Sequence, residues 1–147
     1  MASTMKTKDV IHDLNDLIEL EYDAIAAYTS AIERIDNPAF KSKLSDFLAD
    51  HDRHVDQLTQ AVVKEGGVAK KEGDAKKFLT KGKVVLADMA GDKAILKAMK
   101  SNEEQTNTEY EKAVKKGYAA PIQAVLQQGL DDERRHKAWV ESTLQAL

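Results

Sequence analysis

Cysteine is absent from this 147-residue sequence, and proline and tryptophan are rare, with two and one respectively. Without cysteine the chain can form no disulfide, zinc–thiolate site or iron–sulfur cluster, and it carries no rubredoxin-type electron carrier. The first ten residues contain two lysines but no apolar segment of a signal peptide, and no apolar run approaches the roughly 20 residues that a membrane span needs. We therefore expect a cytoplasmic protein that does not enter the membrane.

A surplus of one charge sign is also missing. The formal net charge is -3 with 32% charged residues, and both signs are mixed along the chain. This pattern gives no basic surface for nucleic acid. Alanine, leucine, lysine, glutamate and glutamine are abundant, which favours helix almost throughout. The length suits one domain over residues 1–147 that buries its own core.

The spacing of apolar residues predicts a bundle of four long helices. We expect them from about Thr7 to Ile35, from Pro38 to just before Gly66, from Gly91 to about Lys116, and from Pro121 nearly to Leu147. Asn37 and Asp92 are the expected N-caps of the second and third helices.

The connection between the second and third helices is some 24 residues long, enough to travel the length of the bundle and make these two helices parallel. Within it, the apolar residues between Phe78 and Met89 predict a short helix.

Polar residues interrupt the apolar stripes in phase with them. The predicted inward polar residues are Glu21 and Tyr28 on the first helix, His51 and His54 on the second, Glu103, Thr106 and Tyr110 on the third, and Glu133 and His136 on the fourth. Unpaired carboxylates and imidazoles in a core cost several kcal/mol each, against a total stability of roughly 5 to 15 kcal/mol. Two divalent metal ions, iron or manganese, would compensate this cost. Without metal, we expect at least one of the three carboxylates to hold a proton.

The two halves of the chain repeat each other at a distance of 82 residues. The shift superimposes Glu21 on Glu103, Tyr28 on Tyr110, Asp50 on Asp132, Arg53 on Arg135 and His54 on His136. Because the repeat preserves the inward polar residues, it indicates a metal site with pseudo-twofold symmetry.

These residues resemble a known signature. A glutamate, 28 intervening residues and then Asp-Glu-x-Arg-His is typical of the ferritin-like diiron-carboxylate proteins, and both halves are similar to it. The tyrosine seven residues after each glutamate is rubrerythrin-like, and the region from Gly82 to Lys116 is similar to bacterial ferritin-like bundles associated with stress. The resemblance implies a ferritin-like four-helix bundle.

Carried over residue by residue, the resemblance implies two groups of site residues. The metal ligands would be Glu21, His54, Glu103, Glu133 and His136, and the residues that orient the histidines would be Asp50, Arg53, Asp132 and Arg135. Tyr28 and Tyr110 are expected beside the ligands, and a ligand carboxylate is the nearest candidate partner for each hydroxyl. His51 stands where the family has its fourth carboxylate. An imidazole can ligate, so we count His51 as a sixth candidate ligand, although it bridges two metals poorly.

The resemblance further implies two iron ions, with manganese or a mixed pair as alternatives. Dioxygen or hydrogen peroxide would be the reactant, and an external donor would supply electrons because the chain has no cysteine. A non-haem diiron oxidase or peroxidase in oxidative stress or iron detoxification is the leading hypothesis. A stress-associated or structural metal-binding bundle without catalysis and an iron-storage protein are the alternatives. A homodimer is a possible assembly.

Overall fold

Four helices make up the regular structure of this computed structural model, which describes residues 5–72 and 91–147. They are α1 (Thr7–Arg34), α2 (Pro38–Lys64), α4 (Asp92–Val114) and α5 (Ala120–Gln145). The described residues form no β-strand. The predicted all-α four-helix bundle is therefore confirmed, and the helix ends differ from the predicted ones by two residues at most.

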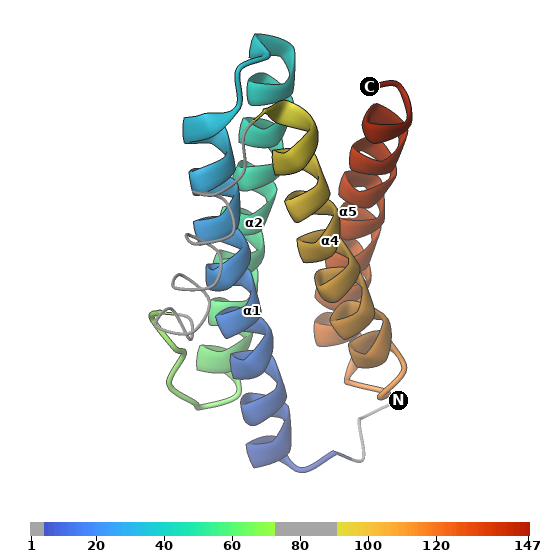
Figure 1. The fold of residues 1–147 in the computed structure, drawn as a ribbon. Helices are drawn as coiled ribbons and strands as arrows, with labels where there is room; N and C mark the ends of the chain where they lie inside the picture. The colour runs from blue at the N-terminus through green and yellow to red at the C-terminus, as the bar shows by residue number, and fades with distance from the viewer. Residues whose placement is uncertain (1–4, 73–90) are drawn as a thin grey trace.

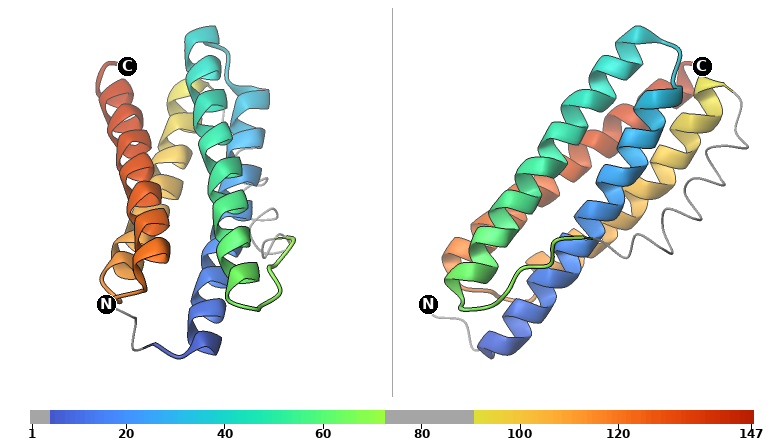
Figure 2. Two further views of the ribbon diagram at one scale, coloured as in Figure 1. Left: turned by 180° about the vertical axis from the view of Figure 1, so that it is seen from behind. Right: turned by 90° about the vertical axis from the view of Figure 1, so that its left-hand side faces the viewer.

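The helices are arranged around a common axis (Figures 1 and 2). α1 packs against α2 and α4, and α5 packs against the same two helices, so α1 and α5 are diagonal to each other. α2 ends at the opposite end of the bundle from the start of α4, and these two helices run parallel, as the long connection predicted (Figure 1). The short helix expected between Phe78 and Met89 lies outside the described residues.

The two predicted N-caps have different outcomes. The Asn37 side chain accepts hydrogen bonds from the backbone N–H groups of Ala39 and Phe40, at 2.9 and 3.3 Å, and so caps α2 as expected. Asp92 does not cap α4, because the capping position is Gly91 with φ +92°.

The carboxylate of Asp92 binds another part of the chain. It accepts from the backbone N–H groups of Asp36 and Asn37, at 2.8 and 3.0 Å. Both N–H groups belong to the turn between α1 and α2, which lies at the same end of the bundle as the start of α4. Asp92 therefore joins this turn to α4.

Apolar residues fill the bundle on both sides of a polar layer. One apolar cluster, which includes Leu14, Ile18 and Leu126, occupies the end with the start of α1. The other includes Leu44, Phe47, Leu96 and Met99 and occupies the opposite end. The helices place Glu21, His51, Glu103 and Glu133 between these clusters in sequence. A polar site is thus enclosed by hydrophobic core on both sides.

One detail of the predicted apolar stripe is wrong. A step of seven residues from Ile18 predicts Ile25 and Ile32 inside, but both are only half-buried, and Ala24 and Ala31 take the inward positions.

Candidate metal centre

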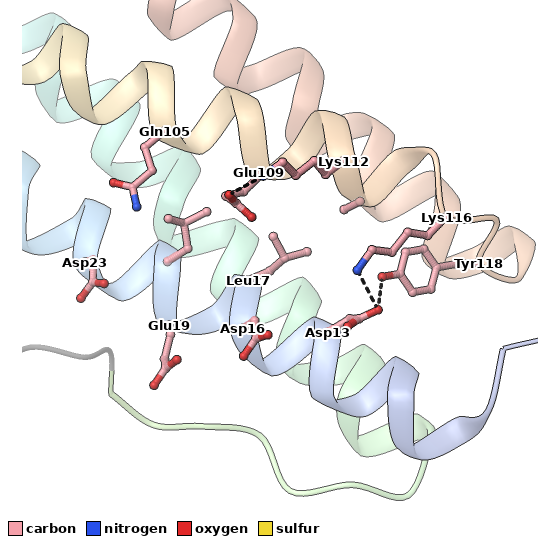
Figure 3. A pocket seen from close by; sticks show the side chains of 12 residues that line it. Asp13, Asp16, Leu17, Glu19, Asp23, Gln105, Glu109, Lys112, Lys116 and Tyr118 are labelled. Carbon is pink, nitrogen blue, oxygen red and sulfur yellow. Dashed lines mark hydrogen bonds and ion pairs between the residues drawn. The ribbon is translucent and has the colours of Figure 1, made fainter.

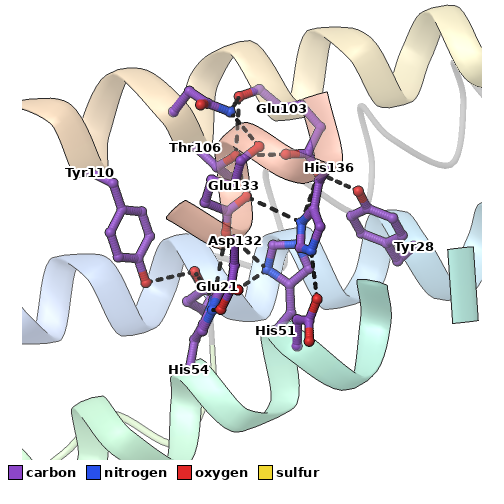
Figure 4. A network of polar contacts seen from close by, with 12 residues as sticks. Glu21, Tyr28, His51, His54, Glu103, Thr106, Tyr110, Asp132, Glu133 and His136 are labelled. Carbon is purple, nitrogen blue, oxygen red and sulfur yellow. Dashed lines mark hydrogen bonds and ion pairs between the residues drawn. The ribbon is translucent and has the colours of Figure 1, made fainter. Parts of the chain in front are cut away.

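Six charged or ionisable side chains from all four helices meet in the polar layer (Figure 4). They are Glu21, His51, His54, Glu103, Glu133 and His136, the six candidate ligands, and every one of them is buried. Their donor atoms form two groups in which all atoms lie within 4.8 Å of one another. The remaining histidine of the chain, His12, is exposed, lies outside the site and is 3.4 Å from Asp16. The sequence therefore predicted which ionisable side chains converge.

The first group contains Glu21, His51, His54 and Glu133. Glu21 Oε1 is 3.3 Å from His54 Nδ1, and Glu21 Oε2 is 2.7 Å from His51 Nδ1. Glu133 Oε1 lies 3.4 Å from His51 Nδ1 and 3.6 Å from His54 Nδ1. Donor atoms at these separations can surround one metal ion, since metal–nitrogen and metal–oxygen bonds are about 2.0–2.2 Å.

The second group contains His51, Glu103, Glu133 and His136. His136 Nδ1 lies 3.7 Å from Glu103 Oε1 and 3.6 Å from Glu133 Oε2. His51 Nε2 lies 3.9 Å from Glu103 Oε1. His51 and Glu133 thus belong to both groups.

An aspartate from the other half of the chain orients each flanking histidine. His54 Nε2–H donates to Asp132 Oδ2 and His136 Nε2–H donates to Asp50 Oδ2, both at 2.8 Å. Because Nε2 is the donor in each ring, Nδ1 is the nitrogen that faces the polar layer. Such hydrogen bonds fix the tautomer and orientation of histidines that ligate metals.

Two arginines hold the two aspartates in place. Arg53 lies 3.1 Å from Asp50 and 2.8 Å from Asp132, and Arg135 lies 2.8 Å from Asp50 and 3.1 Å from Asp132. All four side chains belong to α2 and α5. The ring of charges therefore links these helices beside the histidines.

Each of the two tyrosines of the repeat also binds a residue of the opposite half of the chain. Tyr28 Oη donates to Glu103 Oε1, and Tyr110 Oη donates to Glu21 Oε1 at 2.8 Å. Burial raises the pKa of both hydroxyls, and the neighbouring glutamate charges raise it further. Both tyrosines therefore stay protonated as donors. The 82-residue repeat appears in the structure as reciprocal contacts between the two halves.

The symmetry is broken around the flanking histidines. Phe47 stacks on His136 with ring centroids 4.2 Å apart. Its counterpart in the repeat is Gly129, and a Cβ there would lie 2.5 Å from Tyr110 Cε1. The half of the site around His136 is thus covered by the ring of Phe47. In the other half, Gly129 has no side chain, and the ring of Tyr110 occupies that space.

Two polar residues next to Glu103 support the carboxylates. Thr106 Oγ1 donates to Glu133 Oε2 at 2.9 Å, and Asn107 Nδ2 donates to the backbone carbonyls of Glu103 and Glu133 at 2.7 and 3.0 Å. The apolar spacing predicted Thr106 inside but gave it no role. Asn107 was missed, and its only signal was a polar residue adjacent to the inward stripe.

In the absence of metal, the charges of the site neutralise each other. Burial would raise the pKa of Glu21, but the charges and hydrogen bonds of His51 and His54 outweigh it and hold this pKa well below its usual value. Burial would lower the pKa of the histidines, but the carboxylates raise it, to about 10 for His54 and about 9 for His136. These shifts favour protons on His54 and His136 and an ionised Glu21, so Glu21 is not the carboxylate that we expected to hold a proton.

Three buried atoms of the site test whether a metal fits. His51 Nε2, His136 Nδ1 and Glu133 Oε1 form no hydrogen bond in the described part of the chain. Unpartnered polar atoms in a core are costly, and here all three face other donor atoms that a metal can use. Carboxylate and imidazole ligands together suit iron, manganese and zinc. The residues present fit a metal ion in this layer.

A surface pocket of about 340 Å³ lies between α1 and α4, apart from these six residues (Figure 3). Several carboxylates line it, and some already have partners. Asp13 Oδ2 accepts from Lys116 Nζ at 3.2 Å and from the Tyr118 hydroxyl at 2.8 Å, and Glu109 lies 3.5 Å from Lys112. The pocket is therefore a mixed-charge surface groove.

Among residues 5–72 and 91–147, no helix has the length and hydrophobicity needed to cross a bilayer.

Several solved structures share the fold, including the following three. A bacterioferritin-related protein of Bacteroides fragilis, described as a dodecameric thioferritin, matches 97% of this chain and 88% of its own, with a TM-score of 0.81 and 16% identity. A ferritin-like diiron-carboxylate protein of Bacillus anthracis matches 95% and 99%, with a TM-score of 0.74 and 20% identity. A two-domain protein of Anabaena variabilis with a DJ-1/ThiJ/PfpI-like and a ferritin-like domain matches 97% and 37%, with a TM-score of 0.77 and 10% identity. These similarities show a ferritin-like fold.

The comparison with curated proteins gives no match. The model of one protein family, described as a domain of unknown function (DUF2383), matches residues 9–116. The match covers α1, α2 and α4 with Glu21, His51, His54 and Glu103, and ends before α5. Since it extends over more than half of the sequence, the chain belongs to the DUF2383 family.

Proposed function

We propose that the polar layer binds two metal ions, with iron as the physiological metal, and that the loaded protein reduces hydrogen peroxide or dioxygen. Glu21 and His54 would hold one ion, Glu103 and His136 the other, and Glu133 and His51 would contribute to both. The observation that carries the proposal is the set of three unpartnered buried atoms that face other donor atoms within two overlapping groups. When bound, iron supplies the one-electron chemistry that reduction of these oxidants needs.

The protein's own residues would bind the metal ions, orient the ligand side chains and enclose the site. Asp50 and Asp132 fix the ring positions of His136 and His54, and the apolar clusters on both sides of the layer limit the access of water. The hydroxyls of Tyr28 and Tyr110 hold the carboxylates of Glu103 and Glu21 in one orientation. The chain contains no cysteine, so electrons that regenerate the ferrous state would come from a separate donor.

A role in peroxide or iron detoxification follows from the rubrerythrin-like pairing of each glutamate with a tyrosine seven residues later. Its support in this chain is that both hydroxyls donate to a glutamate of the opposite half. A bundle in which metal serves stability alone would keep these contacts but would show no reaction with the oxidant.

The test separates binding from reaction. Metal-free protein is equilibrated anaerobically with ferrous iron, unbound metal is removed, and the iron per chain is measured. Hydrogen peroxide is then added, and the loss of ferrous iron is followed with a chelating dye against free iron at the same concentration. We expect about two ions per chain and faster oxidation than in the free solution. Protein without bound metal would contradict the whole proposal, whereas binding without faster oxidation would favour the structural alternative.

Iron storage is the second candidate, because one of the proteins similar in fold is described as a dodecameric thioferritin. Storage requires an assembly around a cavity, so the molar mass in solution decides it. A monomer or dimer by light scattering would exclude a storage cage, and a mass near twelve chains would support one.

A further inference from the structure

His51 occupies the centre of the polar layer, with its two ring nitrogens on opposite sides. Nδ1 lies 2.7 Å from Glu21 Oε2 and 3.4 Å from Glu133 Oε1, both in the first group. Nε2 lies 3.9 Å from Glu103 Oε1, in the second group, and forms no hydrogen bond in the described structure. The imidazole is fully buried, so bulk solvent does not reach Nε2. The ring therefore presents one donor atom to each group.

Glu133 shows the same division with its two oxygens. Oε1 lies 3.6 Å from His54 Nδ1 in the first group, and Oε2 lies 3.6 Å from His136 Nδ1 in the second. Glu133 is the counterpart of His51 under the 82-residue shift. The repeat thus relates these two residues across the pseudo-twofold axis, and each offers two donor atoms that point to different halves.

We propose that His51 bridges the two metal ions through both ring nitrogens. This inference rests on the proposed function. Nδ1 would bind the ion held by Glu21 and His54, and Nε2 the ion held by Glu103 and His136. Any proton on either nitrogen passes to solvent as the metal–nitrogen bonds form, and no electrons are transferred. The expectation from sequence that an imidazole is a poor bridge considered the residue type alone, without the position of the two nitrogens.

A simple hydrogen bond is the competing explanation for the position of His51. The ring would then only donate from Nδ1 to Glu21. That arrangement leaves Nε2 buried without a partner, which is costly in a core. A bridge gives each ring nitrogen a metal ion as its partner and gives each ion one nitrogen ligand from His51.

The bridge predicts a measurable separation. Ions held by compact carboxylate or oxygen bridges lie about 3.5–4 Å apart. The two nitrogens of an imidazole diverge, and with metal–nitrogen bonds of about 2.0–2.1 Å a ring on its own would hold the ions ~6 Å apart. The shared carboxylate of Glu133 draws them closer. We therefore expect a separation beyond about 4 Å, longer than in the compact centres.

The experiment measures this distance without relying on activity. The protein is loaded with manganese(II), and the two positions are located in an anomalous difference map of the crystal, with X-ray absorption on the solution as a second measurement. In the parent protein we expect two ions more than about 4 Å apart, with one ring nitrogen of His51 near each. His51→Glu should shorten the separation into the range of about 3.5–4 Å.

His51→Ala tests the contribution to affinity. It should weaken binding of at least one ion by more than the roughly 10–100-fold that loss of an outer hydrogen-bond partner costs. His12→Ala is the matched control, because His12 is an exposed histidine outside the site, and it should leave both the separation and the affinity unchanged.

The outcomes distinguish this inference from the proposed function. Two ions at about 3.5–4 Å in the parent protein, or His51 bound through one nitrogen, would overturn the bridge and leave metal binding intact. A single ion per chain would overturn the bridge and the dinuclear site together. No bound metal would overturn both the bridge and the proposed function.

Discussion

The ring of Tyr110 occupies the space that a side chain at Gly129 would need. A Cβ added to Gly129 would lie 2.5 Å from Cε1 and 3.1 Å from Cζ of Tyr110, and the hydroxyl of this ring holds Glu21 at 2.8 Å. Glycine in the middle of a helix is ordinarily unfavourable by about 0.5–1 kcal/mol relative to alanine. The glycine in α5 is therefore explained by packing: it makes room for Tyr110, which in turn positions the candidate ligand Glu21.

Gly129→Ala should destabilise the protein, although alanine is the better helix former. Overpacking of a tight core costs typically 1–3 kcal/mol, which exceeds the gain in helix propensity. Urea unfolding measures the change. In a Tyr110→Leu background the same substitution should instead stabilise, since the clashing ring is gone. A stabilised Gly129→Ala in the parent background would contradict the packing role.

Removal of Glu103 or Glu133 should lower the bound metal from about two ions per chain to one or fewer, because each carboxylate belongs to a donor group and Glu133 belongs to both. We expect this for Glu103→Ala and Glu133→Ala, measured by metal analysis after removal of unbound metal. Glu104→Ala is the control, since Glu104 follows Glu103 but is exposed. Two ions retained by either core variant would exclude that residue from the site.

Asp132→Asn and Asp50→Asn should weaken metal binding by roughly 10–100-fold each, because each aspartate orients a histidine of the opposite half. The two variants act on different flanking histidines, so each should weaken a different ion, which competitive titration can resolve. Asp52→Asn lies on the exposed face of α2 and should have no effect. An equal effect of all three variants would show a general change of charge instead of a positioning role.

The free energy of unfolding of the metal-free protein should decrease both in acid and in alkali. The pKa values of His54 and His136 are raised from 6.5 to about 10 and about 9, so their contribution is fully present below pH 6.5 and is lost as the pH rises through these values. The lowered pKa of Glu21 acts in the opposite sense: its contribution is present above pH 4.5 and is lost in acid. Thermal melting of the apoprotein should therefore be highest near pH 5–6.5.

Bound metal should oppose the loss of stability at alkaline pH. Binding requires Nδ1 of the flanking histidines without a proton, so affinity and the metal-induced rise in melting temperature should increase with pH between 6.5 and 9. Manganese(II) under anaerobic conditions avoids oxidation during the measurement. A melting temperature that manganese and iron leave unchanged at every pH would contradict a buried metal site.

The sequence by itself determined the helices, their approximate ends and the residues that face inward. Pro38 and the capping residue Asn37 define the start of α2, and the period of apolar residues placed Glu21, His54 and His136 in the core, because a helix repeats its buried face every three to four residues. The 82-residue repeat indicated the pseudo-twofold symmetry that the structure shows as reciprocal contacts.

Only the tertiary structure decided which inward groups meet. The periodicity of a helix gives a face but neither the height of a side chain relative to other helices nor its rotamer. The sequence therefore predicted a ligand carboxylate as the partner of Tyr110 but left open which one, and the structure pairs this tyrosine with Glu21 across 89 residues. For the same reason Asp92 was taken as the cap of its own helix, although packing places it beside the turn between α1 and α2. The pKa values of His54 and His136 are raised because both imidazoles lie within 4 Å of the carboxylates, a closeness that depends on the packing of all four helices.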